Sequence, residues 1–154
     1  MSIKKIITKS AAETQQYARE LAQHILSKKP LAGAVVLCLK GDLGAGKTTF
    51  TQGFAEGLGI TEKILSPTFV VMKRFEISGD SGFKNFYHLD CYRLNDTHDL
   101  EVLGIKESLI NGENIIVIEW PEKAGALLPT ERIEINFDHD EGEQRMITIK
   151  DIRS

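Results

Sequence analysis

A glycine-rich segment in the first third of the chain carries the strongest chemical signal. Residues 41–48 read Gly-Asp-Leu-Gly-Ala-Gly-Lys-Thr and match the pattern G-x-x-x-x-G-K-[ST] at every position. Glycines let the backbone wrap closely around phosphate oxygens, and the N–H groups at a helix N-terminus attract an anion. In such a loop Lys47 reaches the β- and γ-phosphates and the Thr48 hydroxyl ligates Mg²⁺. The segment therefore predicts a site for a nucleoside triphosphate with Mg²⁺.

Two acidic residues are candidates to complete this site. A phosphate loop usually works with an acid at the end of a second buried strand, where the acid holds Mg²⁺ or its waters. Asp90 ends the apolar segment 86–90, and Glu119 ends the apolar segment 114–119. Both are expected to have catalytic roles, and either one could be the primary metal carboxylate.

Three residues close to these segments carry weaker signals. Thr68 lies in a short Ser-Pro-Thr loop, where it either senses the γ-phosphate, as in switch-type nucleotidases, or belongs to a plain turn. Arg93 follows Asp90 by three residues and either stabilises transferring phosphate or forms a surface ion pair. Trp120 packs near the site, against a partner, or at the edge of the core. Among the four histidines, His88 is the nearest in sequence to a candidate site residue.

The segments that must position these residues alternate between strand-like and helix-like patterns. Ser10 can cap a helix that runs to about Ser27, and a second helix is expected over 47–57. The runs 34–39 and 114–119 are continuously apolar, which indicates strands buried on both faces, as in a parallel sheet. The remaining expectations are a short strand over 3–8, an antiparallel hairpin over 68–77 and 83–89, a helical segment over 95–110 interrupted at Gly104, and a C-terminal hairpin over 131–138 and 144–152.

Together these elements predict one α/β domain over residues 1–154. The phosphate loop between a buried strand and a helix indicates a P-loop NTPase-like, three-layer domain with a mixed, partly parallel central sheet. A chain of 154 residues with 42% hydrophobic and 27% charged residues fits a single globular domain.

Composition also excludes several function classes. The formal net charge is −3, which argues against a protein that coats DNA. No apolar run is long enough to span a membrane, and the N-terminus has no apolar core of signal-peptide length. Cys38 and Cys91 both lie in apolar stretches and are interpreted as buried free thiols in a reducing compartment. The expected location is therefore the cytoplasm, without a membrane partner.

Four motifs in order along the chain resemble the TsaE family, formerly called YjeE. They are GDLGAGKTTF at 41–50, SPTF at 66–69, HLDCYR at 88–93 and IEWP at 118–121. Very many proteins share the phosphate loop, whereas the H-x-D-x-Y-R block combined with E-W is far more specific. The order, spacing and total length fit the family over essentially the whole chain.

The resemblance implies an ATPase that is needed for threonylcarbamoyladenosine modification of tRNA at position 37. The resemblance also implies that the protein acts with the TsaD–TsaB heterodimer and does not transfer the threonylcarbamoyl group itself. Contact with tRNA is expected to be indirect, although the sequence does not decide whether tRNA is touched directly. Carried over by position, the phosphates of ATP are held by Gly44, Ala45, Gly46, Lys47, Thr48 and Thr49. Thr48 and Glu119 ligate Mg²⁺, Asp90 positions the metal or the attacking water, and Thr14 lies near the adenine.

The main alternative is a small P-loop kinase. Such kinases usually carry a lid with several arginines, whereas this chain has six arginines in total and no arginine-rich segment. A GTPase switch is disfavoured because the Asn-Lys-x-Asp motif that reads guanine is absent. A transporter ATPase is disfavoured because there is no Leu-Ser-Gly-Gly signature.

Overall fold

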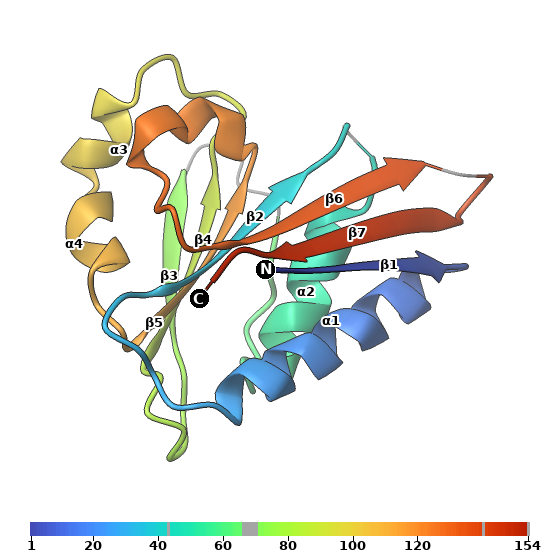
Figure 1. The fold of residues 1–154 in the computed structure, drawn as a ribbon, viewed down its shortest axis with the longest axis horizontal. Coiled ribbons are helices and arrows are strands. Elements are labelled where there is room, and N and C mark those ends of the chain that lie inside the picture. Colours follow the sequence, from blue (N-terminus) through green and yellow to red (C-terminus); the bar gives the residue numbers. More distant parts are fainter. Residues whose placement is uncertain (43, 66–70, 140, 154) are drawn as a thin grey trace.

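A single mixed sheet organises the protein (Figure 1). The computed structural model describes residues 1–42, 44–65, 71–139 and 141–153. Within them, seven strands follow the spatial order β1-β7-β6-β2-β5-β4-β3. Their bounds are β1 (Ser2–Thr8), β2 (Val35–Lys40), β3 (Met72–Glu76), β4 (Asn85–Asp90), β5 (Asn114–Glu119), β6 (Ile133–His139) and β7 (Arg145–Asp151). β6, β2, β5 and β4 are parallel neighbours, whereas β7, β1 and β3 join antiparallel. The predicted mixed, partly parallel sheet is confirmed.

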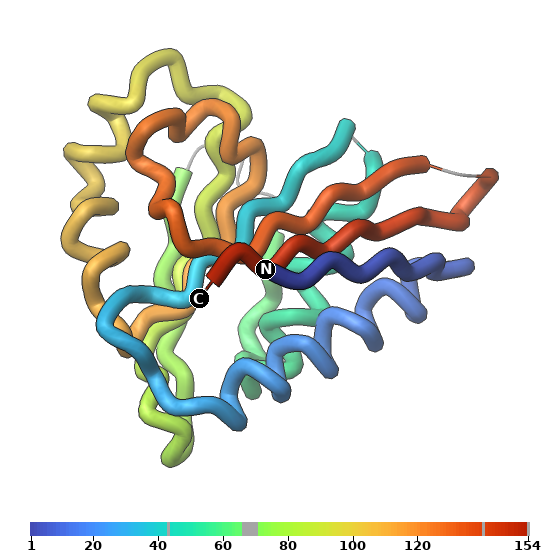
Figure 2. Tube along the Cα trace, viewed as in Figure 1, coloured from blue at the N-terminus to red at the C-terminus, as the bar shows by residue number. Residues whose placement is uncertain are grey.

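Helices cover both faces of the sheet, which explains the continuous hydrophobicity of its central strands. All of β5 is buried, and so is β2 except for Lys40. On one face, apolar residues of the sheet pack with α1 (Ala11–Leu26) and α2 (Lys47–Gly57). On the other face, a second cluster packs with α3 (His98–Val102), α4 (Ile105–Leu109) and the 3₁₀-helix η1 (Pro121–Leu127). The trace in Figure 2 shows the same three layers, as predicted.

Two glycines let α2 lie directly against α1. A Cβ atom on Gly53 would lie 2.4 Å from the carbonyl oxygen of Gln15, and one on Gly57 would lie 2.5 Å from that of Arg19. The Arg19–Glu56 ion pair bridges the same two helices at 2.7 Å. Because α2 begins at the phosphate loop, this close crossing also helps to fix the position of the loop.

The remaining predicted elements agree with the structure, with two refinements. The helical segment 95–110 divides into α3 and α4 at Gly104, where φ is +79°, so the expected interruption is confirmed. η1 follows Trp120 and was not expected from the sequence. Both hairpins form, and the part of the first one that contains Thr68 lies outside the described residues. No helix in the described part of the chain is both long enough and apolar enough to cross a membrane.

Candidate active site at the carboxyl edge of the sheet

The phosphate loop connects the end of β2 to the start of α2, as the sequence predicts. Gly44 and Gly46 have φ values of +79° and +103°, in the left-handed region that L-residues with a Cβ rarely adopt. Gly46 is the N-cap of α2 and supplies no side chain to cap the first turn. The N–H groups of that turn have no carbonyl partners within the helix, so they are available to an anion.

Strand alternation brings both predicted carboxylates to this end of the sheet. On the face covered by α2, β4 presents Phe86, His88 and Asp90, and β5 presents Ile115, Val117 and Glu119. Each series changes from apolar to polar toward its carboxyl end. Parallel pairing places Asp90 directly beside Glu119. Both acids therefore lie at the edge where the phosphate loop begins.

Glu119 makes the central contacts of the site. Its side chain is buried, and its Oε1 atom lies 3.5 Å from the hydroxyl of Thr48. Its Oε2 atom lies 2.5 Å from Nε2 of His88, which is buried as well. The structure thus brings Glu119 to the phosphate-loop residue with which the sequence associates it.

Asp90 is half-buried beside Glu119 and is held by its own turn. One carboxylate oxygen accepts a hydrogen bond from the backbone N–H of Tyr92 at 3.0 Å. Burial and the neighbouring charge of Glu119 raise the pKa of Asp90, and they outweigh the lowering effect of the Tyr92 hydrogen bond. A raised pKa makes this carboxylate a better proton acceptor than an exposed aspartate.

Lys47 lies beneath the loop with its ammonium group already engaged. It donates to the carbonyl of Gly41, and its Nζ lies 3.6 Å from the centroid of the Trp120 ring. Burial lowers the pKa of Lys47, although the charges of Glu119 and Glu122 oppose that shift. A cation over an indole ring is attracted by the electrons of the ring face. Trp120 therefore lies in the candidate site.

The backbone at Trp120 is unusual. Its φ is +58°, the one positive value of a non-glycine residue in the described part of the chain. Its ring also packs on Tyr92, with the centroids 4.9 Å apart, and it borders the second apolar cluster. A bulky residue in the left-handed region costs free energy, and such strain gathers at functional sites.

Four other predicted residues remain, and the structure describes three of them. Thr14 is buried in α1, and its hydroxyl is hydrogen bonded to that of Thr8 at 2.7 Å. Arg93 is exposed on the turn after β4. Thr49 is partly exposed in the first turn of α2. Thr68 lies outside the described residues.

Sequence reasoning missed one cation at the phosphate loop. Arg145 begins β7, and its Nη2 atom donates to the carbonyl of Gly44 at 3.3 Å across 101 residues of chain. The same guanidinium donates to the carbonyls of Gly142 and Gln144 at 2.8 and 3.0 Å. No local motif marks Arg145. Only the pairing of β7 with its neighbours brings it here.

The residues present suit Mg²⁺ bound together with phosphate. The described residues hold no cluster of three or more His, Cys, Asp or Glu side chains that would bind a metal ion by themselves. Thr48 and Glu119 instead offer two adjacent oxygen ligands of different elements. Mg²⁺ prefers oxygen ligands and is usually bound by one or two side chains together with substrate phosphates and waters.

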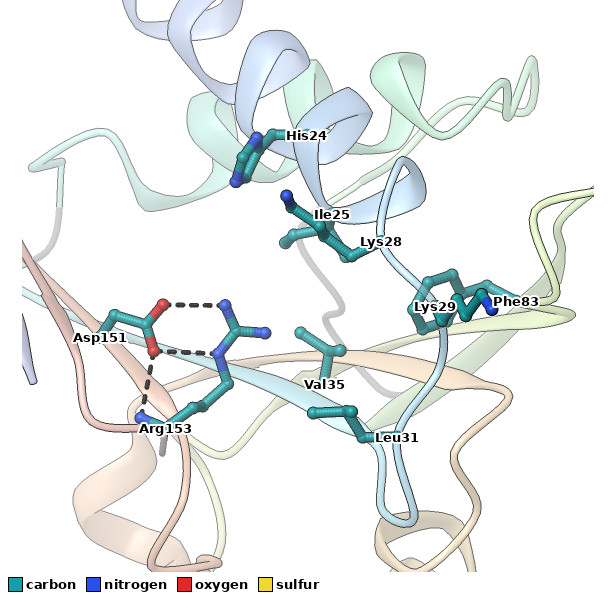
Figure 3. Close-up of a pocket in the computed structure, with 9 residues that line it drawn as sticks. All are labelled: His24, Ile25, Lys28, Lys29, Leu31, Val35, Phe83, Asp151 and Arg153. Carbon is teal, nitrogen blue, oxygen red and sulfur yellow. Dashed lines mark hydrogen bonds and ion pairs between the residues drawn. The ribbon is translucent and has the colours of Figure 1, made fainter.

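A pocket lies at the opposite end of β2 from the candidate active site (Figure 3). It measures about 300 Å³, and basic side chains of α1, of the residues that follow α1 and of the C-terminal segment surround its apolar floor. Lys28 and Lys29 follow the C-terminus of α1, where the helix dipole favours cations. Arg153 binds Asp151 through two hydrogen bonds of 2.9 and 2.8 Å. This contact pairs two of the charges there, whereas the phosphate loop, Asp90 and Glu119 lie at the other end of the sheet.

Comparisons with known proteins identify the family of the chain. Residues 8–147 match the model of the family described as "Threonylcarbamoyl adenosine biosynthesis protein TsaE". The protein named "tRNA threonylcarbamoyladenosine biosynthesis protein TsaE" from Haemophilus influenzae is 39% identical over 124 residues, which cover 80% of this chain and 75% of that protein. The protein of the same name from Bacillus subtilis is 44% identical over 113 residues, covering 73% and 67%.

A solved structure supports the same assignment. The crystal structure of Bacillus subtilis YdiB superposes with a TM-score of 0.76 and 35% sequence identity. It covers 98% of this chain, and the match takes in 86% of YdiB. The motifs, the fold and these likenesses together show that the chain belongs to the TsaE family of tRNA threonylcarbamoyladenosine biosynthesis proteins.

Proposed function

We propose that this protein binds ATP with Mg²⁺ and hydrolyses it in support of threonylcarbamoyladenosine modification of tRNA. The observation that carries the proposal is the convergence of the phosphate loop with Glu119 and Asp90 at one edge of the sheet. A sheet edge can form without a phosphate loop, so the complete motif at this edge favours a nucleotide site over a purely structural role. ATP is preferred over GTP because the chain has no Asn-Lys-x-Asp motif for the guanine edge.

Each residue has a distinct task. The N–H groups of residues 44–49 cradle the phosphates, and Arg145 steadies the loop through the carbonyl of Gly44. Lys47 exchanges its contacts with Gly41 and Trp120 for the β- and γ-phosphates. Thr48 and Glu119 hold Mg²⁺, which neutralises charge on the phosphates when bound. Asp90 orients the attacking water and accepts its proton.

Hydrolysis by the isolated protein is expected to be slow. Phosphoryl transfer depends on positioning and charge stabilisation, and an arginine supplied by a partner can contribute a factor on the order of 10³–10⁵. Arg93, the arginine nearest to Asp90 in the sequence, is exposed on the turn after β4. We therefore place the TsaD–TsaB heterodimer as the partner that completes the site near Trp120 and Thr68.

Lys47→Ala provides the first test. Titration calorimetry should show loss of productive Mg-ATP binding, whereas Lys106→Ala, which changes an exposed lysine of α4, should bind like wild type. Circular dichroism checks that both variants are folded. Normal ATP turnover by a folded Lys47→Ala protein would contradict the assignment of the phosphate loop as the ATP site.

The role of the partner is tested by steady-state turnover with and without TsaD–TsaB. The pair should raise ATP turnover, and ATP should in turn tighten binding of the pair by the same factor by which the pair tightens ATP binding. Thr68→Ala is expected to weaken this coupling. Fast turnover by the protein alone, unchanged on adding the pair, would favour a self-sufficient enzyme such as a small kinase.

A further inference from the structure

His88 and Glu119 form a buried pair that the proposed reaction does not by itself require. The relative exposure of each residue is 2%, and the His88 Nε2 to Glu119 Oε2 distance is 2.5 Å. Asp90 pairs with Glu119 across β4 and β5, so His88, two residues earlier in β4, is the diagonal neighbour of Glu119. Such diagonal neighbours on one face are within reach of long side chains.

The two oxygens of the Glu119 carboxylate have different neighbours. Oε2 is held by His88 on the interior side, and Oε1 is the oxygen nearest the Thr48 hydroxyl, at 3.5 Å. Without a hydrogen bond donor at Oε2, a buried carboxylate would lose solvation that nothing replaces, and its side chain could rotate toward Lys47 or Asp90. The pairing therefore fixes both the location and the rotation of the carboxylate.

We propose that His88 is a positioning residue that holds one oxygen of Glu119 so that the other faces Thr48 as the Mg²⁺ ligand. The proposal rests on the proposed function, because it assigns the orientation of that metal carboxylate. In this role His88 acts through its contact with Glu119. Hydrogen bonds of this kind behind a metal ligand typically change metal affinity or activity by about 10–100-fold when they are removed.

Two substitutions separate the hydrogen bond from the space that the ring fills. In His88→Gln, the amide nitrogen is four bonds from Cα, as Nε2 of histidine is, so the donor to Glu119 is kept. In His88→Asn, the amide nitrogen is one bond closer to Cα and cannot reach the same oxygen. His98→Asn, at an exposed histidine of α3, is the control for the chemical change.

The measurements are ATP binding in EDTA and in Mg²⁺ by titration calorimetry, together with kcat, KM and the unfolding temperature. We expect the affinity of His88→Asn for ATP in EDTA to lie within about twofold of the wild-type affinity. The factor by which Mg²⁺ increases ATP affinity should be about 10–100-fold smaller than in wild type, and kcat should fall by a similar factor. KM for ATP in Mg²⁺ should rise together with this loss of binding, because KM approaches Kd when hydrolysis is slow. His88→Gln and His98→Asn should stay within about threefold of wild type, since the donor to Glu119 is present in both.

The outcomes distinguish this role from a structural one and from failure of the proposed function. Equal loss in folded His88→Gln and His88→Asn, or no loss in His88→Asn, would overturn the positioning role. If His88→Asn does not fold, His88→Gln decides, because a folded His88→Gln protein without Mg²⁺ enhancement also overturns it. Absence of Mg²⁺-dependent ATP binding in the wild-type protein would instead reject the proposed function.

Discussion

Substituting Gly53 by alanine should destabilise the protein, although the same change stabilises most helices. In an ordinary helix interior, Gly→Ala gains about 0.8–1.0 kcal/mol. Here the new Cβ would lie 2.4 Å from the carbonyl oxygen and 2.6 Å from the Cα of Gln15, whereas ordinary contact begins at 3.4 Å. Both obstructing atoms belong to the backbone of α1, so no rotamer change relieves the clash. The two helices must separate by about 1 Å, the difference between these distances.

Overpacking of this kind costs about 1–3 kcal/mol net. For a chain of this size, that loss corresponds to a fall in Tm of roughly 2–12 °C. Separation of the helices would also lengthen the Arg19–Glu56 bridge and move the start of α2, so nucleotide binding should weaken as well. A misplacement of about 1 Å in an active site can cost about 100-fold in rate.

The assay is urea unfolding followed by circular dichroism, with Gly33→Ala as the matched control. The nearest atom to a Cβ on Gly33 is the carbonyl oxygen of Leu109 at 3.4 Å, and φ there is not positive, so that variant should be as stable as wild type. A Gly53→Ala protein with wild-type or higher stability would refute the conclusion that these glycines set the distance between α1 and α2.

Three further predictions concern other parts of the molecule. Cys38 and Cys91 are buried free thiols whose pKa burial raises to about 12, so neither should react with a thiol reagent in the folded protein at neutral pH, and rapid labelling would contradict this. Burial tends to raise the pKa of Glu134, but the hydrogen bonds from Arg132 and the charge of Lys40 lower it below the usual 4.5. The stability that this pairing adds is therefore present above pH 4.5 and lost as pH falls through the lowered pKa, so Glu134→Gln should cost about 1 kcal/mol in urea unfolding at pH 7 and less at pH 3. Arg145→Ala should weaken ATP binding about 2–12-fold in calorimetry, from the loss of a hydrogen bond worth about 0.5–1.5 kcal/mol that steadies the loop, and unchanged affinity would exclude that role.

The amino-acid sequence by itself determined the features that depend on near neighbours. The phosphate loop is readable because its glycines, Lys47 and Thr48 act within eight consecutive residues. The buried strands 34–39 and 114–119 are readable because a strand covered on both faces must be apolar throughout. The break at Gly104 follows from the backbone freedom of glycine, and the structure confirms it. Asp90 and Glu119 could be identified as strand ends, but not as direct neighbours.

Tertiary structure alone decided which of these residues meet. Thr48 and Glu119 are 71 residues apart, and Gly44 and Arg145 are 101 residues apart, so no spacing rule connects them. Their contacts depend on strand order and register, which in a parallel sheet are set by packing of whole faces rather than by a short turn. The same packing brought His88 to Glu119, placed Lys47 over the ring of Trp120, and buried the hydroxyl of Thr14 against Thr8. A linear pattern shows that a side chain faces inward, but the neighbour it meets there is chosen by the other elements of the fold.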